Sequence, residues 1–367
     1  MTVFTSAQQR SKGRRRVRLE TSVNAEKPRN FVSAASVARA AGVSAATVSY
    51  VINGKTGVSP ETRRRVISVA NELGFRPRSS GPGLNPQRTR VIGLVLPNIL
   101  NPMYTRWAQG VISAAAAAGY EVLTAITQDD VDTLGQTTST LASRNVDGVI
   151  IAAALREDAS ALRTLRTARI PFVYLSRRSK YLEGDYVGID DSAAAALIMG
   201  HVLGHGYTDI ATVIGPRFSS ASLAREKGLV RAAAEAGLTI PGEWRISTQL
   251  NNVGGRMAAR SLFDSKRPPR VILCGSDDIA IGIMEYAVSQ GLRIPEDIAI
   301  TGADGLPHSI SGLINLTTIV QPQQEMASEA FAMLLKRMEN PSTSYQSLIC
   351  AHKLHIGRTC GCNPAAD

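Results

Sequence analysis

The fold of the amino-terminal part of the chain is decided by residues 37–52, VARAAGVSAATVSYVI. Gly42 separates two helical stretches, and glycine readily adopts the left-handed backbone that a tight turn between helices requires. Ser44 follows in the position of an N-cap for the second helix. Apolar residues at i, i+3 and i+4 give that helix an inward face, which consists of Val48, Val51 and Ile52. The stretch therefore predicts two helices joined by a short turn.

The outward face of the second helix is small or polar where the helix begins. It carries Ala45, Ala46, Ser49 and Tyr50. Such a face allows a helix to enter the major groove of DNA. A third helix is expected after Ser59 and Pro60, in cap and N1 positions, with Gly74 past its end. The pattern predicts a helix-turn-helix; the alternative, an ordinary three-helix bundle, explains the caps but not the charge around them.

Basic residues are concentrated in this same quarter of the chain. The 367 residues include 41 Lys and Arg against 30 Asp and Glu, a net charge of +11. The first 90 positions hold 17 of the basic and four of the acidic residues, which gives them +13 and leaves −2 for the remainder. Cationic side chains that neutralise phosphates supply most of the sequence-independent affinity for nucleic acids. We interpret residues 1–30 as a disordered basic arm, but a solvated tail does not account for Arg63–Arg65.

A stretch rich in glycine, proline and serine within residues 78–90 predicts a hinge or linker. Beyond it, short apolar runs alternate with helical stretches. The runs are 91–96, 120–126, 147–152, 171–175, 209–214, 271–274 and 298–302. This alternation predicts βαβ units with parallel sheets, and hence an α/β fold. Because roughly 270 residues exceed what one core accommodates, we expect two lobes with a ligand site between them.

The segment from Val37 to Pro77 resembles the DNA-binding headpiece of the lactose-repressor (LacI/GalR) family of bacterial transcription regulators, and the likeness extends from Phe31 to Cys360. Its further motifs are Pro97, Asn101-Pro102, Val146-Asp147-Gly148, Gly204-His205, Arg225 with Gly228, Ser276-Asp277, Gly302 with Asp304, and Thr317-Thr318-Ile319. The resemblance implies a type I periplasmic-binding-protein-like body in a repressor whose affinity for operator DNA is controlled by an effector, a sugar or related metabolite. It also implies a homodimer or a tetramer.

The resemblance also divides the chain into domains. Residues 31–77 become the helix-turn-helix domain and residues 91–360 the effector-binding and dimerisation domain. Within the effector-binding domain, lobe one is expected at about 91–190 and 320–344, and lobe two at about 191–319 and 345–360. A tail is expected at 361–367.

The residues that contact DNA are implied position by position. The base-reading positions correspond to Ala45, Ala46 and Tyr50. The phosphate-contacting positions correspond to Ser44, Thr47, Ser49, Asn53, Ser59 and Thr62. Tyr50 stands where an arginine is common, so bidentate pairing with guanine is lost at that step. In the hinge, Leu84 matches a minor-groove wedge, but Gly81-Pro82-Gly83 disfavours the helix that usually carries it.

The effector site implied by the resemblance lines the cleft between the lobes. Its residues are Asn98, Met103, Tyr104, Arg177, Arg225, Ser276 and Asp304. These side chains can form directional hydrogen bonds and stack on a ring. Arg225 has the alternative of a surface ion pair, and Asp304 that of a turn former. Asp190 and Asp191 are expected to cap the helix from Ser192 rather than bind a ligand.

The cysteine and histidine pattern does not predict a metal centre. The four cysteines are Cys274, Cys350, Cys360 and Cys362, too scattered for a disulfide framework. The carboxy-terminal group has zinc-ligand atoms but lacks the spacing of a known zinc motif; it consists of Cys350, His352, His355, Cys360 and Cys362. His201 and His205 lack the glutamate of a zincin helix and are expected to flank a helix end. We therefore expect no metal and no cofactor.

Two other functional classes were weighed. An enzyme is disfavoured, because Gly54-Lys55-Thr56 lacks the first glycine of a P-loop and Asp277-Asp278 lacks a neighbouring nucleophile or base. The second class is a solute-binding protein with the same two-lobed body and no regulatory DNA binding. The basic headpiece and the absence of a signal peptide count against it. We expect a cytoplasmic protein with no catalytic residues and no membrane partner.

Overall fold

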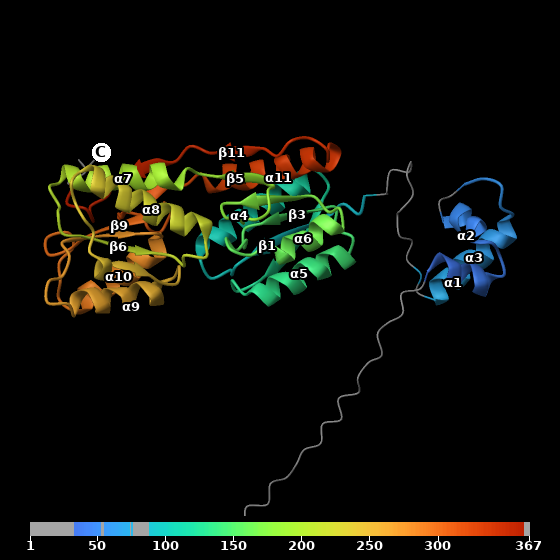
Figure 1. Ribbon diagram of the computed structural model, residues 1–367, viewed down its shortest axis with the longest axis horizontal. Coiled ribbons are helices and arrows are strands. Elements are labelled where there is room, and N and C mark those ends of the chain that lie inside the picture. Colours follow the sequence, from blue (N-terminus) through green and yellow to red (C-terminus); the bar gives the residue numbers. More distant parts are fainter. Residues whose placement is uncertain (1–32, 53–54, 74, 76–87, 363–367) are drawn as a thin grey trace, which may run out of the picture. The chain divides into compact units, whose positions relative to one another are not determined.

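The computed structural model describes residues 33–52, 55–73, 75 and 88–362. It divides the chain into two compact units, Met1–Gln87 and Arg88–Asp367, whose separate folds are drawn in Figure 1. Several sequence-based predictions lie outside the described residues, namely the arm at 1–30, Asn53, the hinge segment Gly81-Pro82-Gly83 with Leu84, and the end of the tail at 363–367.

The first unit is a three-helix domain made of α1 (Ala34–Ala41), α2 (Ala45–Ile52) and α3 (Pro60–Glu72). Gly42 ends α1 in the left-handed conformation, with φ at 65° and ψ at 36°, and α1 and α2 are bent by 105° relative to each other. One valine from each helix, Val37, Val48 and Val66, is fully buried in the shared core. The predicted helix-turn-helix is confirmed.

No single helix among the described residues is both long and apolar enough to cross a membrane. The pair α1 and α2 reaches that length and apolar content only when taken together, and the pair is sharply bent.

The first lobe of the second unit contains a six-stranded parallel sheet within residues 88–362. Its spatial order is β11 (Ser347–Ile349), β5 (Asp185–Gly188), β4 (Phe172–Leu175), β3 (Gly148–Ile151), β1 (Val91–Leu96) and β2 (Glu121–Ile126). In Figure 1 one face is covered by α4 (Pro102–Ala117) and α11 (Gln323–Glu339), and the other by α5 (Val131–Ser143) and α6 (Ser160–Thr167). Leu94 packs into one core and Val95 into the other, which explains why the strands read as unbroken apolar runs.

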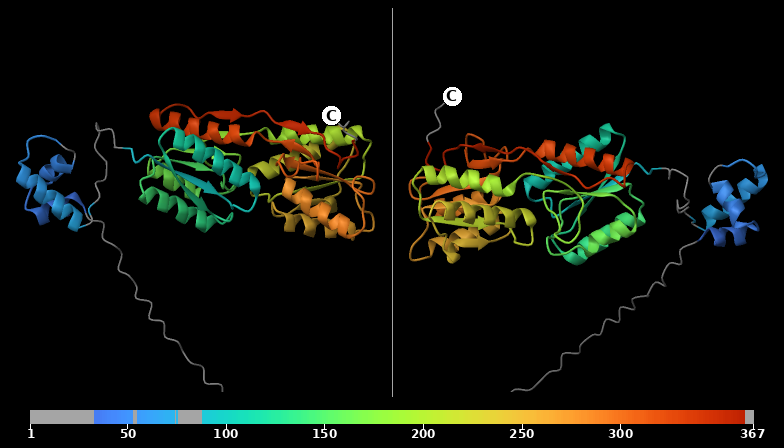
Figure 2. Two further views of the ribbon diagram at one scale, coloured as in Figure 1. Left: turned by 180° about the vertical axis from the view of Figure 1, so that it is seen from behind. Right: turned by 45° about the horizontal axis from the view of Figure 1, so that its top comes forward.

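The second lobe repeats this architecture. Its spatial order is β12 (Lys353–His355), β10 (Thr317–Val320), β9 (Ala299–Asp304), β8 (Val271–Cys274), β6 (Ile210–Ile214) and β7 (Arg245–Ser247), with β12 antiparallel to β10. The helices are α7 (Asp191–Gly204) and α8 (Ser220–Glu235) on one side, α9 (Asn252–Phe263) and α10 (Asp277–Ser289) on the other, as Figures 1 and 2 show. Gly228 lets α8 approach α7, since a Cβ there would lie 2.8 Å from the Ser192 carbonyl oxygen.

The chain passes between the two lobes three times within residues 88–362. The crossings fall between β5 and α7, between β10 and α11, and between β11 and β12. In the views of Figure 2 the carboxy-terminal segment runs alongside both lobes. Because β5 leads directly into α7, the end of the first sheet and the start of the second lobe are joined by two residues.

The third crossing differs from the expected boundary. Residues 345–360 were assigned to lobe two, whereas β11 pairs with β5 in the first sheet and the chain crosses only after Ile349. The reason is a buried ion pair: Arg337 donates from Nε and Nη2 to both carboxylate oxygens of Asp185, at 2.6 and 2.9 Å, and Asp185 also accepts the Gln346 N–H at 2.9 Å. This network holds the residues before β11 against the first sheet.

Candidate DNA-binding and effector-binding sites

The outer face of α2 begins with a side-chain cap. Ser44 Oγ accepts the Thr47 N–H at 3.1 Å, which satisfies one of the helix's unpaired amino-terminal donors. Ala45, Ala46, Ser49 and Tyr50 are exposed, and Thr47 is half-buried. The helix thus presents the methyl groups of Ala45 and Ala46 at its start and the ring of Tyr50 one turn later. This is the surface shape predicted for a helix that enters a groove.

Tyr50 is the largest side chain on this face and is 46% exposed. The Lys55 ammonium lies 5.4 Å from the centre of its ring, within the range of a cation–π contact. A phenol ring with a cation beside it can contact a base edge while the charge approaches a phosphate. The structure therefore pairs Tyr50 with a positive charge, which the sequence analysis did not foresee.

Arg63 has a structural task rather than a free surface position. Its guanidinium donates to the Val51 carbonyl oxygen at 3.3 Å and to the Lys55 carbonyl oxygen at 2.6 Å, so that it caps the end of α2 from α3. Arg64 and Arg65 are exposed. The basic run Arg63–Arg65 therefore divides into two parts. Arg64 and Arg65 supply the exposed positive charge, whereas Arg63 holds the end of α2.

Ser59 and Thr62 sit at the start of α3. Ser59 Oγ accepts the Thr62 N–H at 3.3 Å and donates to Thr62 Oγ1 at 2.9 Å, and Pro60 occupies the first helical position. The predicted cap is confirmed. The role of both residues as phosphate contacts stays a prediction.

In the first lobe, Tyr104 and Arg177 meet at the carboxyl ends of the strands. Arg177 is only 3% exposed and donates to Tyr104 Oη and to Asp129 Oδ1, both at 2.6 Å. Burial raises the pKa of Tyr104, an effect that Arg177 opposes. Asp129 was missed by the sequence analysis, although it lies just after β2, where polar residues of a parallel sheet commonly face a ligand.

In the second lobe, Arg225 forms a buried ion pair. Its Nε donates to Asp191 Oδ1 at 2.8 Å and its Nη1 to the Gly275 carbonyl oxygen at 2.6 Å. The side chain of Arg225 is only 11% exposed and that of Asp191 only 6%. Burial raises the pKa of Asp191, and Arg225 counters part of that rise. The alternative of a surface ion pair does not hold, because this pair is enclosed. Asp190 caps α7 by accepting the Ala193 N–H at 2.9 Å, whereas Asp191 serves as the partner of Arg225.

Asp304 lies at the end of β9 in a cluster of buried carboxyl groups. It accepts the Gln321 amide at 3.0 Å and the Asp277 N–H at 3.3 Å, while Asp277 accepts the Thr318 hydroxyl at 2.5 Å. Burial, and then the neighbouring Asp277, raises the pKa of Asp304 well above its usual range. Asp304 therefore braces the ends of three elements, β9, β10 and α10, in addition to any contact with a ligand.

Electrostatic interactions link these groups. Asp304 raises the pKa of Tyr104 and Arg225 lowers it, both more weakly than burial and Arg177 do. Three other predicted residues have clear structural roles: Asn98 accepts the N–H groups of Leu100 and Asn101 at 3.0 Å, Met103 packs in the core, and Ser276 caps α10 by accepting the Ile279 N–H at 3.2 Å. Whether these three contact an effector stays a prediction.

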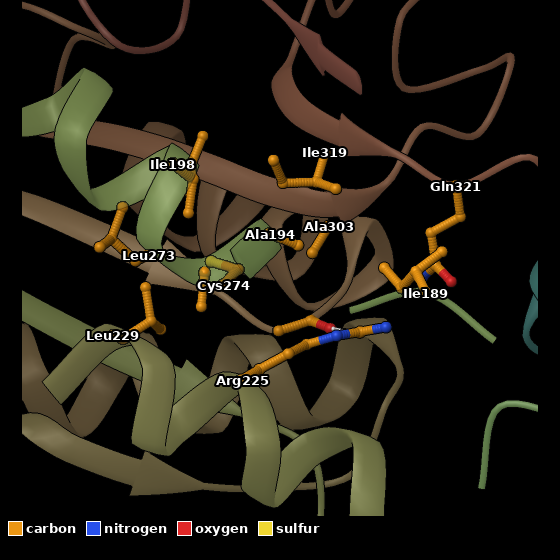
Figure 3. A pocket seen from close by; sticks show the side chains of 12 residues that line it. Ile189, Ala194, Ile198, Arg225, Leu229, Leu273, Cys274, Ala303, Ile319 and Gln321 are labelled. Atoms are coloured by element: carbon orange, nitrogen blue, oxygen red, sulfur yellow. Dashed lines mark hydrogen bonds between the residues drawn. The ribbon is translucent and has the colours of Figure 1, made fainter. Parts of the chain in front are cut away.

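A small apolar cavity lies beside Arg225. It has a volume of about 20 Å³, space for roughly one water molecule. Figure 3 shows the Arg225 side chain extending from α8 beneath the side chains of Ile198, Ala194 and Ile319. A cavity of this size is too small for an effector.

A larger cavity, of about 460 Å³, lies between the lobes, in the size range of small-molecule sites. From the first lobe it is lined by Arg156, Ser176, Arg178, Ser179, Lys180 and Tyr186. From the second lobe it is lined by Asp190, Asp191, Ser192, Ser220, Ala221 and Ala224, and at the crossings by Ile189 and Ile349. The lining includes none of the seven predicted effector residues, all of which are in the described part of the chain.

The charges around this interlobe cavity are largely paired. Arg156 and Lys180 both contact Glu157. The Arg178 guanidinium lies over the Tyr186 ring at 4.6 Å, and the backbone N–H of Arg178 donates to Ser220 Oγ at 2.9 Å, which links the lobes. A sequence signal was available, because the polar run Ser176–Lys180 directly follows β4. The interlobe cavity thus offers hydroxyl groups together with charged groups, of which Arg156, Lys180 and Asp191 have ion-pair partners.

Comparison with known proteins gives a consistent result. Residues 35–78 match the family model described as bacterial regulatory proteins, lacI family, and residues 199–360 match that of a periplasmic binding protein-like domain. The chain is 33% identical over 295 residues to the HTH-type transcriptional regulator DegA of Bacillus subtilis, covering 80% of this chain and 87% of DegA.

Two further similarities cover most of the chain. Identity to the ribose operon repressor of Haemophilus influenzae is 29% over 314 residues, covering 85% of this chain and 94% of that repressor. A solved complex of the transcriptional regulator CelR with cellobiose superimposes with a TM-score of 0.69 at 26% identity, covering 89% of this chain and 99% of CelR. These relatives are named as transcriptional regulators, which favours regulation over catalysis for this fold and sequence.

Proposed function

The chain belongs to the lacI family of bacterial regulatory proteins, and we propose that it is a repressor in which α2 reads operator DNA and the interlobe cavity binds the effector. A helix-turn-helix joined to a periplasmic-binding-protein-like body makes it a DNA-binding transcription regulator rather than a solute-binding protein without DNA binding. Repression is the mode of the named ribose operon relative. Because such a regulator acts on the chromosome, we assign it to the cytoplasm.

The proposed DNA contacts follow from the residues exposed on the outer face of α2. Ala45, Ala46 and Tyr50 are the base-reading candidates, since all three are exposed on the face opposite the buried Val48 and Val51. The capping hydroxyl groups of Ser44 and Ser59 lie at helix starts, where N–H groups favour phosphate. Thr47, Ser49, Asn53 and Thr62 are proposed to add phosphate contacts, and Leu84 a minor-groove contact.

The interlobe cavity supports a sugar as effector. Serine hydroxyl groups from both lobes, among them Ser179 and Ser220, can donate to or accept from the hydroxyl groups of a sugar. Because Arg156 and Lys180 share Glu157, and Asp191 is held by Arg225, the cavity suits a neutral, hydroxyl-rich molecule. The cellobiose complex of CelR and the ribose operon repressor are consistent with that class.

The single observation that carries this proposal is that both lobes line one cavity. A ligand that contacts both lobes stabilises their closed arrangement through its differential affinity for that state. Tyr104, Arg177, Arg225 and Asp304 are proposed to form the polar wall next to it, since their charges act on one another across the lobes. We further propose that the second unit carries dimerisation, with a homodimer as the operator-binding form and a tetramer as the alternative.

The test is calorimetric titration of the full chain with neutral mono- and disaccharides, ribose and cellobiose included. Arg178→Met keeps an unbranched chain over Tyr186 but removes the guanidinium donors, so the affinity of the binding sugar should fall at least tenfold, about 1.5 to 3 kcal/mol. Arg231→Met, on the exposed side of α8, is the matched control. Fluorescence anisotropy should give an unchanged operator affinity for both variants without sugar.

Two outcomes would contradict the proposal. If no sugar in the panel raised the melting temperature or released heat, the neutral-sugar class would be wrong. If Arg178→Met bound its sugar as tightly as the parent, the interlobe cavity would not be the effector site.

A further inference from the structure

Four zinc-ligand side chains converge on the second lobe, away from the interlobe cavity. His201 and His205 lie one helical turn apart at the end of α7, and Cys360 and Cys362 lie on the carboxy-terminal segment. The ligand atoms of all four lie within 4.8 Å of one another. In the sequence, the two histidines and the two cysteines are about 155 residues apart, and neither pair alone predicts a metal site.

The distances agree with those around one tetrahedral ion. His205 Nε2 lies 3.1 Å from Cys362 Sγ, and His201 Nε2 lies 3.3 Å from Cys360 Sγ and 3.7 Å from Cys362 Sγ. Zinc bonds of about 2.3 Å to sulfur and about 2.1 Å to nitrogen put tetrahedral sulfur and nitrogen ligands about 3.6 Å apart. The observed values scatter around that figure, so an ion at the centre requires only small shifts of the side chains.

The local backbone brings each pair together. An i, i+4 spacing puts both imidazoles on one face of α7, with ring centres 5.0 Å apart. Gly361, between the cysteines, has a φ of +96°, and a Cβ there would lie 3.2 Å from Tyr207 Oη. A side chain at this position would be strained, so the short segment that presents both thiols depends on glycine.

Further contacts orient the sulfur atoms. The Thr317 hydroxyl, on β10, donates to Cys360 Sγ at 3.0 Å, and Tyr207 Oη donates to the Cys360 carbonyl oxygen at 3.3 Å. Thr317 Oγ1 in turn accepts the Gly357 N–H at 2.9 Å, so the hydroxyl proton is directed at sulfur. Hydrogen bonds of this kind hold ligands in place around protein metal ions.

We propose that His201, His205, Cys360 and Cys362 bind one zinc ion that joins the carboxy-terminal segment to α7. Two imidazole and two thiolate ligands in a tetrahedron are the donor set that zinc prefers, whereas calcium and magnesium require oxygen ligands. Four protein ligands leave no open position for a substrate, so the site is structural. The ion would hold the segment after β12 against the carboxy-terminal end of α7. The amino-terminal end of α7 lines the interlobe cavity.

The experiment uses the full chain purified under reducing conditions. Elemental analysis should find one zinc per chain, and replacement by cobalt should give the visible bands of a tetrahedral complex together with a thiolate-to-cobalt charge-transfer band. His205→Asn and Cys362→Ser, at the two less buried ends of the cluster, should each lower zinc affinity at least tenfold and abolish the charge-transfer or ligand-field intensity of a complete site. A chelator should lower the melting temperature of the parent alone.

Matched controls come from the same segment. Cys350→Ser and His352→Asn change the same residue types outside the cluster and should leave zinc content and the cobalt spectrum unchanged. Zinc content well below one per chain, an unchanged spectrum in Cys362→Ser, or an intact-mass deficit of two hydrogens from a Cys360–Cys362 disulfide in the reduced preparation would each overturn the proposal. An unchanged spectrum in Cys362→Ser would indicate that the metal binds elsewhere. A disulfide in the reduced preparation would indicate that Cys360 and Cys362 form a redox pair.

Discussion

The outer face of α2 and the interlobe cavity are built in opposite ways. The outer face of α2 comes from four exposed residues within six consecutive positions, on one short helix that shares its core with two others; these residues are Ala45, Ala46, Ser49 and Tyr50. The interlobe cavity collects side chains from the loop after β4, the crossing into α7, the start of α8 and β11. A substitution on α2 therefore changes what the helix touches, whereas one beside the cavity also changes how the lobes hold together.

The two regions also differ in how exposed their charged groups are. α2 contains no charged residue, and Lys55, the cation beside Tyr50, is exposed. Around the interlobe cavity, Arg225 and Asp191 are enclosed and satisfied by each other. An exposed cation is available to a phosphate, but an enclosed pair contributes to function only by fixing the groups around it. Two substitutions test this contrast, and a third tests a partly buried carboxyl group on α10; they follow from the largest expected effect to the smallest.

Arg225→Ala should destabilise the second unit strongly. Removing the guanidinium leaves the Asp191 carboxylate buried without its partner, and breaking such a pair costs about 3 to 5 kcal/mol. Urea unfolding followed by circular dichroism measures the change. The double variant Arg225→Met with Asp191→Leu should recover most of the loss, because neither charge then remains buried alone. A single variant as stable as the parent would mean that the pair is open to solvent.

Tyr50→Ala should change base preference without unfolding the headpiece. Tyr50 is half exposed and does not belong to the buried core of the three-helix domain, so the fold should tolerate its loss. Discrimination at one base step per half-site should fall by about 1 to 3 kcal/mol. Selection from a random DNA library reads this out. Asn53→Ala, as the comparison, should weaken all sequences about equally; an unchanged preference in Tyr50→Ala would place the ring off the bases.

Asp278→Asn should produce the smallest effect, one that depends on pH. Burial raises the pKa of Asp278 to about 6, with His308 opposing that rise. A carboxyl group with a higher pKa in the folded protein stabilises the fold when protonated, so its contribution is lost as pH rises through about 6. The variant should equal the parent at pH 4 and exceed it at pH 7 by about 1 kcal/mol, because the side chain is partly open to solvent.

Urea midpoints at both pH values check this prediction. Asp264→Asn, an exposed carboxylate at the end of α9, is the control and should change neither midpoint by a comparable amount. A stabilisation of Asp278→Asn that was equal at both pH values would show that the carboxyl group does not titrate in this interval.

Local patterns in the sequence predicted the fold well. The turn at Gly42, the caps at Ser44 and Ser59 and the buried strand beginning at Val91 all depend on residues within one turn or one strand, and the structure has them. Five short strands, β5, β7, β10, β11 and β12, were not among the predicted apolar runs. Three of them, β7, β11 and β12, have only three residues each, and the position of β11 depends on Arg337.

The effector region was harder to predict, because its partners are distant in sequence. Arg225 and Asp191 are 34 positions apart, Arg177 and Asp129 are 48, and no periodicity links them. Arg178 and Lys180 were overlooked for a different reason, since a basic run after a strand also occurs on solvated loops. The histidine and cysteine cluster combines both difficulties, because each half is unremarkable until β10 and α7 bring them together.

The anchor that Arg63 provides also bears on how this regulator can acquire new targets. The guanidinium holds the end of α2 through the carbonyl oxygens of Val51 and Lys55, which every residue type possesses. Substitution of Ala45, Ala46 or Tyr50 leaves that attachment untouched. Operator preference can therefore drift over evolutionary time, or be rewritten by design, while the angle at which the helix is presented stays the same.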